Sequence, residues 1–185
     1  MLIDNLTIIG VGLIGGSLAR ALRKAKLVGR VTGCNRSEET LKKAVELDVI
    51  DDYSLNISEV VRDADVIVIG TPLSVSEKML PKLADLMTVN TILTDVGSVK
   101  GGIVSVARES LAEKFPNFVP GHPIAGTENN GVEASYEDLF VDHRVILTPL
   151  KETSTKAHKL ITKMWESVGA EVVDLDVEHH DEVLA

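Results

Sequence analysis

The chain has 185 residues, a single cysteine and a formal net charge of −9 at pH 7. This length suits one ordinary domain with a sizeable hydrophobic core. Cys34 alone excludes an internal disulfide and a cysteine cluster for zinc or iron–sulfur, which favours a reducing compartment. The acidic balance argues against a nucleic-acid partner, because affinity for nucleic acid depends largely on Lys and Arg contacts with phosphate.

The apolar residues occur in short runs. None reaches the roughly 18 residues of a membrane span, and no basic stretch leads into an apolar signal region after Met1. We therefore expect a cytoplasmic protein with no membrane partner. An anionic small molecule is compatible with the negative charge, because helix N-termini and one or two Arg residues form local anion sites.

Short β-branched runs alternate with longer stretches of helical periodicity, a pattern typical of βαβ units and of a parallel sheet covered on both faces. We predict an α/β fold, a doubly wound and mostly parallel Rossmann-type sheet with helices on both faces. The predicted strands are residues 6–9, 31–34, 66–69, 91–94, 118–120, 144–147 and 171–174. Residues 1–175 are expected to form one domain, whereas residues 176–185 begin a new helical pattern that stops abruptly.

One helix is predicted with particular clarity near the C-terminus. Apolar residues recur there at helical spacing, and Gly169 suits the end of the helix. The stripe consists of Ala157, Leu160, Ile161, Met164, Trp165 and Val168. We interpret it as core packing, with no role for Met164 or Trp165 as a cofactor ligand.

The glycine-rich motif Gly10-Val11-Gly12-Leu13-Ile14-Gly15 directly follows an apolar strand and opens a helix. In this setting Gly10 makes the tight turn, Gly12 lets the backbone approach a pyrophosphate, and Gly15 allows the helix to pack on the strand. A plain structural turn is the alternative. The strand before and the helix after favour a dinucleotide-binding site, which makes residues 1–175 a dinucleotide-binding Rossmann domain.

The second predicted strand is followed by Asn35-Arg36-Ser37. A site for NAD has an Asp or Glu about 20 residues beyond the glycines, where it binds the ribose 2′-hydroxyl. Asn35 stands there instead, while Arg36 can bind a 2′-phosphate and Ser37 can add a donor, so NADP is favoured over NAD. The alternative is a solvated Arg36 and a Ser37 that caps the next helix, and the cap is compatible with a phosphate contact.

Gly70-Thr71-Pro72 follows the strand at residues 66–69, at the carboxyl edge of the sheet where such folds bind ligands. Thr71 and Pro72 line the nicotinamide half of the site or form a simple turn, and the residues alone do not distinguish the two.

Two later strand ends carry polar residues that packing does not require. In the first, Asp95-Val96-Gly97-Ser98-Val99-Lys100, Ser98 either caps the next helix or faces a substrate, and Lys100 is expected to be solvated. In the second, Gly121-His122-Pro123-Ile124-Ala125-Gly126-Thr127-Glu128, Pro123 restricts His122 to an extended backbone. Histidine is the side chain best suited to accept an alcohol proton near neutral pH, so His122 is the candidate base.

The other histidines are expected at the surface. They are His143, His158, His179 and His180. The pair His179-His180 has no nearby Cys or third His, so we expect no metal site.

Four stretches together resemble the prephenate/arogenate dehydrogenase family. They are residues 10–19, 95–100, 121–128 and the tail His179-His180-Asp181-Glu182-Val183-Leu184-Ala185. The resemblance implies NADP-dependent oxidative decarboxylation of prephenate or arogenate in tyrosine biosynthesis. By the same resemblance, His122 accepts the ring hydroxyl proton and Ser98 orients His122 and the substrate. Thr127 and Glu128 lie at the substrate end of the cleft.

The chain departs from the family in two respects. Asn35-Arg36 replaces the acidic residue of NAD-specific members, which points to NADP. The family also continues into a helical domain that forms a homodimer and binds the substrate carboxylates, so residues 176–185 are expected to be the start of a truncated helical dimerisation domain. We therefore expect this chain to bind cofactor and to turn over poorly or not at all by itself.

Two alternative functions remain open on the sequence. One is another NADP-dependent small-molecule dehydrogenase or reductase, which leaves the Gly121-His122-Pro123 motif unexplained. The other is a non-catalytic module that binds NADP.

Overall fold

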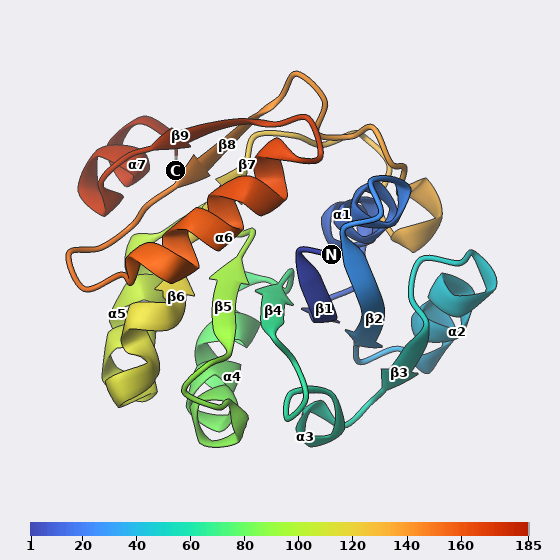
Figure 1. Ribbon diagram of the computed structural model, residues 1–185, viewed down its shortest axis with the longest axis horizontal. Helices are drawn as coiled ribbons and strands as arrows, with labels where there is room; N and C mark the ends of the chain where they lie inside the picture. The colour runs from blue at the N-terminus through green and yellow to red at the C-terminus, as the bar shows by residue number, and fades with distance from the viewer. Residues whose placement is uncertain (185) are drawn as a thin grey trace.

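The structure is a computed structural model that describes residues 1–184, in which nine strands form two sheets (Figure 1). The larger sheet contains six strands in the order β3-β2-β1-β4-β5-β6, and every pair of neighbours is parallel. The strands are β1 Ile3–Ile9, β2 Val28–Cys34, β3 Asp52–Ser54, β4 Val66–Ile69, β5 Ile92–Asp95 and β6 Phe118–Val119. The strand order reverses between β1 and β4, which places a ligand crevice at their carboxyl ends.

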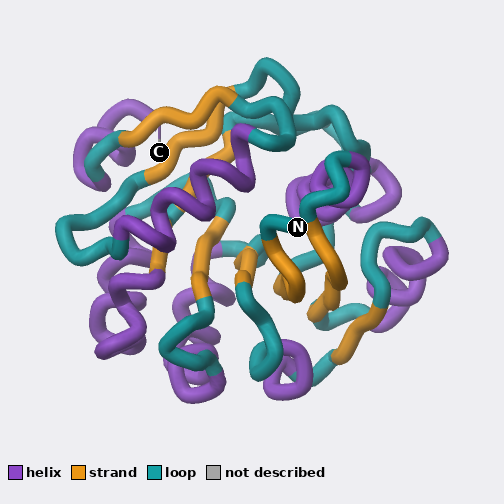
Figure 2. The backbone as a smooth tube through the Cα atoms, in the orientation of Figure 1, coloured by secondary structure: helices purple, strands orange, loops and turns teal. Residues whose placement is uncertain are grey.

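Helices cover both faces of this sheet (Figure 2). One face packs against α1 Leu13–Lys24, α2 Glu38–Glu46 and α6 Thr155–Glu166. The other packs against α3 Ile57–Val60, α4 Leu73–Leu86, α5 Gly101–Leu111 and the 3₁₀ helix η1 Ala112–Asn117. This arrangement confirms the predicted doubly wound α/β fold.

Strand β4 shows why the sheet needs helices on both sides. All four of its residues are buried. Val66 and Val68 point into the core beneath α1 and α6, whereas Ile67 and Ile69 point into the core beneath α4 and α5. Alternate residues of a strand face opposite sides, so a continuous apolar run has to be covered twice.

The last three predicted strands do not all extend the main sheet. The chain leaves β6 at Pro120, which has no backbone N–H to donate, and starts a separate three-stranded sheet. It consists of β7 Gly121–Pro123, β8 Arg144–Leu147 and β9 Glu171–Asp174, with β7 antiparallel to β8 and β8 parallel to β9. A short 3₁₀ helix, η2 Val132–Ala134, lies in the connection from β7 to β8.

The C-terminal elements agree with the sequence in their local form. Four residues of the predicted α6 stripe are buried helix residues: Ala157, Ile161, Met164 and Trp165. Gly169 adopts a φ of +91°, as a residue just past a helix end often does. A final helix, α7 Val177–Leu184, follows β9, and Ala185 lies outside the described residues. No helix in residues 1–184 combines the length and apolarity needed to cross a bilayer.

Candidate active site

The glycine-rich turn joins β1 to α1 at the crevice. Gly10 has a φ of +97°, and a Cβ there would lie 2.6 Å from the carbonyl carbon of Gly70. Only glycine fits such a position without strain. At Gly12 an added Cβ would meet nothing within 4 Å, so the backbone is open to a ligand. Within residues 1–184, no side chain caps the α1 N-terminus and no acidic residue lies in its first turn, which leaves its N–H groups available to an anion.

A cavity of about 360 Å³ lies on the β2 side of the glycine turn. Its wall includes Asn35, Arg36 and Lys82, and among the described residues no Asp or Glu contributes to it. The Asn35 side chain accepts a hydrogen bond from the Arg36 N–H at 3.0 Å. Ser37 lies outside the wall and caps α2 by accepting from the Thr40 N–H at 3.2 Å.

A second cavity, of about 560 Å³, adjoins the first. The two walls share Gly10, Gly12, Gly70, Thr71 and Pro72, so the cavities form one groove across the switch point. The second wall also contains Leu13, Ile14, Gly15, Ser98 and Thr127. The structure therefore brings most of the predicted cofactor residues to one groove, whereas Val11 is buried in the core.

The turn after β4 is held by a residue that the sequence analysis missed. Ser76, in the first turns of α4, is buried, and its hydroxyl lies 2.9 Å from that of Thr71. It also donates to the carbonyls of Thr71 and Pro72. This network shapes the part of the wall common to both cavities.

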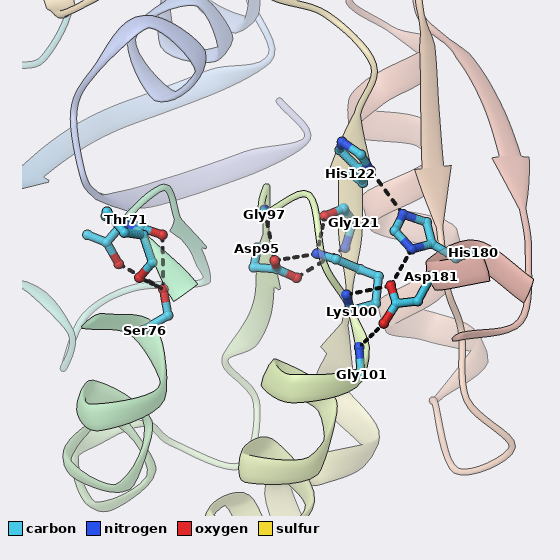
Figure 3. A network of polar contacts seen from close by, with 11 residues as sticks. Thr71, Ser76, Asp95, Gly97, Lys100, Gly101, Gly121, His122, His180 and Asp181 are labelled. Atoms are coloured by element: carbon cyan, nitrogen blue, oxygen red, sulfur yellow. Dashed lines mark hydrogen bonds and ion pairs between the residues drawn. The ribbon is translucent and has the colours of Figure 1, made fainter. Parts of the chain in front are cut away.

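The end of β5 carries a buried ion pair. Lys100 is fully buried and its ammonium contacts Asp95 Oδ2 at 2.5 Å and the Gly121 carbonyl at 2.6 Å. The other Asp95 oxygen accepts from the Gly121 N–H at 3.2 Å. The prediction of a solvated Lys100 was wrong, because the side chain turns inward to a carboxylate at the end of the preceding strand. The pair fixes the start of β7, and hence His122, beside the β5 edge of the groove (Figure 3).

Ser98 is exposed in the wall of the second cavity and does not cap α5. The cap comes instead from α7, where the Asp181 carboxylate accepts from the N–H groups of Lys100 at 2.9 Å and Gly101 at 2.8 Å. Because Asp181, 81 positions after Lys100, caps the helix, the Ser98 hydroxyl is not used as a cap.

His122 is partly buried on β7, and its Nδ1 lies 2.9 Å from Nε2 of His180 (Figure 3). Burial, together with the electrostatic effects of the neighbouring His180 ring and of the Lys100 ammonium, lowers the pKa of His122 to about 4, although Asp181 acts in the opposite direction. His122 is therefore neutral near pH 7 and retains a lone pair that can accept a proton. It lies between Gly121, which contacts Asp95, and Ala125, which lines the second cavity.

The surface position predicted for His180 was wrong. His180 is fully buried on α7, and its Nδ1 lies 2.7 Å from Asp181 Oδ1. His143 and His179 are exposed as predicted, whereas His158 is partly buried and contacts Asp174 at 3.0 Å. The sequence offered no local signal for His180, because its environment depends on α7 packing beside β7.

The two remaining predicted substrate residues lie in the loop after β7. Thr127 lines the second cavity and exchanges hydrogen bonds with the backbone of Asn129. Glu128 is exposed and lies outside the walls of the groove.

A six-stranded parallel sheet, a glycine-rich turn at its switch point and an uncapped helix N-terminus facing the groove define a dinucleotide-binding domain. A sequence profile described as the nucleotide-binding domain of prephenate dehydrogenase matches residues 18–174. The chain belongs to this family.

Three relatives illustrate the similarity. The cyclohexadienyl dehydrogenase of Zymomonas mobilis is 36% identical over 181 residues, which cover 98% of this chain and 61% of that protein. A crystal structure of Aquifex aeolicus prephenate dehydrogenase with hydroxyphenyl propionate and NAD+ superposes with a TM-score of 0.90 at 37% identity, covering 97% of this chain and 62% of that one. Synechocystis arogenate dehydrogenase gives 0.87 at 31% identity, covering 96% and 62%. The chain thus spans about three-fifths of the length of these relatives.

Proposed function

We propose that this chain is the dinucleotide-binding domain of an NADP-dependent enzyme that oxidatively decarboxylates prephenate or arogenate in tyrosine biosynthesis. The observation that carries the proposal is a neutral histidine, His122, on β7 directly after Gly121, whose N–H contacts Asp95 in the wall of the groove. The relatives named for prephenate, arogenate and cyclohexadienyl dehydrogenation supply the reaction class.

The groove has the features that a dinucleotide requires. The open backbone at Gly12 and the uncapped N-terminus of α1 suit a pyrophosphate. Arg36 and Lys82 supply positive charge where an NAD site would have a carboxylate, so they favour a ribose 2′-phosphate. When bound, the nicotinamide supplies the hydride acceptor.

Oxidation of a cyclohexadienol requires a group that takes the hydroxyl proton, and His122 has the protonation state for it. Loss of the ring carboxylate as carbon dioxide then leaves an aromatic product. The exposed Ser98 hydroxyl, in the wall next to Asp95, can donate to or accept from the same substrate oxygen. Thr127 is proposed to contact the substrate further along the groove, and Glu128 to approach it from the same loop.

We also propose that residues 1–175 form the dinucleotide-binding domain and that residues 176–185 begin a helical domain through which the full-length gene product forms a homodimer. The greater length of the relatives supports this division. Light scattering tests it, with a monomer expected for residues 1–185 and a dimer for the full-length gene product. A dimer of the 185-residue chain itself would contradict it.

The cofactor assignment is tested by calorimetric titration of the chain with NADP and with NAD. We expect tighter binding of NADP, and Arg36→Ala should weaken it by about 10- to 100-fold, the loss of one charged hydrogen-bonded contact, with little effect on NAD. Arg62→Ala is the matched control, because it removes the same charge from an exposed position outside the groove. Tighter binding of NAD would refute the assignment.

The reaction is tested with the full-length gene product that contains this chain. Prephenate and arogenate are assayed with NADP, and His122→Asn should lower kcat by about 10²- to 10⁴-fold while cofactor affinity is unchanged. His143→Asn, at an exposed position, serves as the control. Tight NADP binding without turnover of either substrate would instead favour a non-catalytic binding module.

A further inference from the structure

Three side chains lie in a line that ends at the candidate base. The Asp181 carboxylate contacts His180 Nδ1 at 2.7 Å, and His180 Nε2 contacts His122 Nδ1 at 2.9 Å (Figure 3). His180 is fully buried, and the rings of the two histidines meet edge to face, with centroids 5.1 Å apart. His180 and Asp181 belong to α7, 58 residues or more from His122, so only the fold places them together.

The ionised state of Asp181 determines which nitrogens of the two histidines carry protons. Burial opposes ionisation of Asp181, but hydrogen bonds from the Lys100 and Gly101 backbone and from His180 outweigh it and lower the pKa of this carboxyl. An ionised carboxylate only accepts hydrogen bonds, so His180 carries a proton on Nδ1. Its Nε2 is then free to accept from His122.

Two features of the surroundings suit His180 as the acceptor in its bond with His122. The ring is fully buried. The Asp181 carboxylate that faces its Nδ1 is already shared with two backbone N–H groups at the positive end of α5.

We propose that His180 and Asp181 are positioning residues that hold His122 in its Nδ1–H form, so that the Nε2 lone pair faces the substrate hydroxyl. The proposal rests on the function proposed above. In this arrangement Asp181 accepts from His180, His180 accepts from His122, and the far edge of the His122 ring, which points away from His180, carries the lone pair (Figure 3). Among the described residues, no hydrogen-bond partner occupies His122 Nε2.

The same aspartate links this line to the buried ion pair. Asp181 caps α5 at Lys100, whose ammonium contacts Asp95 and the Gly121 carbonyl next to His122. A Cβ on Gly101 would lie 3.0 Å from Asp181 Oδ2, so a small residue is needed for the cap. The orientation of His122 is thus set from both sides, by Lys100 through the backbone and by α7 through the ring.

The closing experiment reads the proton directly. Long-range ¹H–¹⁵N correlation spectra of the ¹⁵N-histidine-labelled chain at pH 7 distinguish the protonated from the unprotonated ring nitrogens of each histidine. We expect His122 to be protonated at Nδ1 and unprotonated at Nε2. A proton on His122 Nε2 in the unmodified chain would overturn the proposal, since His180 would then be the donor.

Three variants test the cause. His180→Gln keeps an amide oxygen that can accept from His122 and should retain its Nδ1–H form, whereas His180→Ala should give a mixture of both forms. Asp181→Asn presents an N–H to His180 and should move the His122 proton to Nε2. His179→Ala, an exposed neighbour on α7, is the control and should change nothing. If His122 keeps its Nδ1–H form in both His180→Ala and Asp181→Asn, and both variants have a native circular dichroism spectrum, the proposal is refuted.

Kinetics of the full-length gene product provide a second readout. His180→Ala should lower kcat by about 10²-fold or more with an unchanged KM for the cofactor, and His180→Gln should recover part of the loss. Because the spectra need no substrate, the two proposals fail separately. The expected Nδ1–H form without turnover would refute the proposed reaction alone, and turnover with His122 protonated at Nε2 would refute the positioning role alone.

Discussion

Replacement of Lys100 by Met should destabilise the chain strongly. The Lys100 side chain is 0% exposed and Asp95 is 2% exposed, so the variant leaves a carboxylate in the interior without its cation. Breaking a buried ion pair by removing one partner typically costs about 3–5 kcal/mol, because the remaining charge is desolvated and unpaired. Two backbone N–H groups, of Gly97 and Gly121, still contact Asp95 and keep the loss within this range.

The loss is measured by urea unfolding, followed through the fluorescence of the fully buried Trp165. A 4 kcal/mol loss with a slope of about 2 kcal/mol/M moves the midpoint down by roughly 2 M. The double variant Asp95→Asn/Lys100→Met should recover part of the loss because no buried charge remains, and Lys24→Met, at an exposed ion pair, should leave the midpoint unchanged. A Lys100→Met midpoint equal to that of the unmodified chain would refute the reasoning.

Two further predictions follow from the turn and from the histidine. Gly10→Ala should lower the free energy of unfolding by about 1–3 kcal/mol and abolish dinucleotide binding in calorimetry, because φ is +97° and the new Cβ would meet Gly70 at 2.6 Å. The control is Gly126→Ala, which has open space around its Cβ and should leave the free energy of unfolding unchanged in the same urea assay. The pKa of His122 is about 4 in the folded chain, against an ordinary value of 6.5 for histidine, so the unfolded chain binds more protons between these pH values. Its contribution to stability, about 1–3 kcal/mol, is complete above pH 6.5 and is lost as the pH falls toward 4. The stability gap between the unmodified chain and His122→Asn should therefore shrink in unfolding measurements between pH 7 and pH 4.5, and parallel curves would contradict this.

Much of the fold could be predicted because its signals are local. The two apolar periodicities, the glycine turn and the α6 stripe each lie within one element and its immediate neighbours, and the structure confirms them. The short edge strand β3, Asp52–Ser54, was missed because three residues with polar ends carry no detectable alternation. The second sheet was missed for another reason, since whether β7 extends the main sheet or starts a new one depends on which strand it pairs with.

The features of the site also fall into those set by local sequence and those set by tertiary packing. Residue types and spacing by themselves determined that a dinucleotide groove forms at the glycine turn and that His122 stands at a strand end, because backbone conformation and strand polarity are set by neighbours in the chain. Only the tertiary structure decided that Lys100 is buried and that His180 and Asp181 reach His122. Those contacts join α7 to residues 58 and 81 positions away, and burial over such separations depends on the packing of whole elements. No short stretch of the sequence contains the information that determines these contacts.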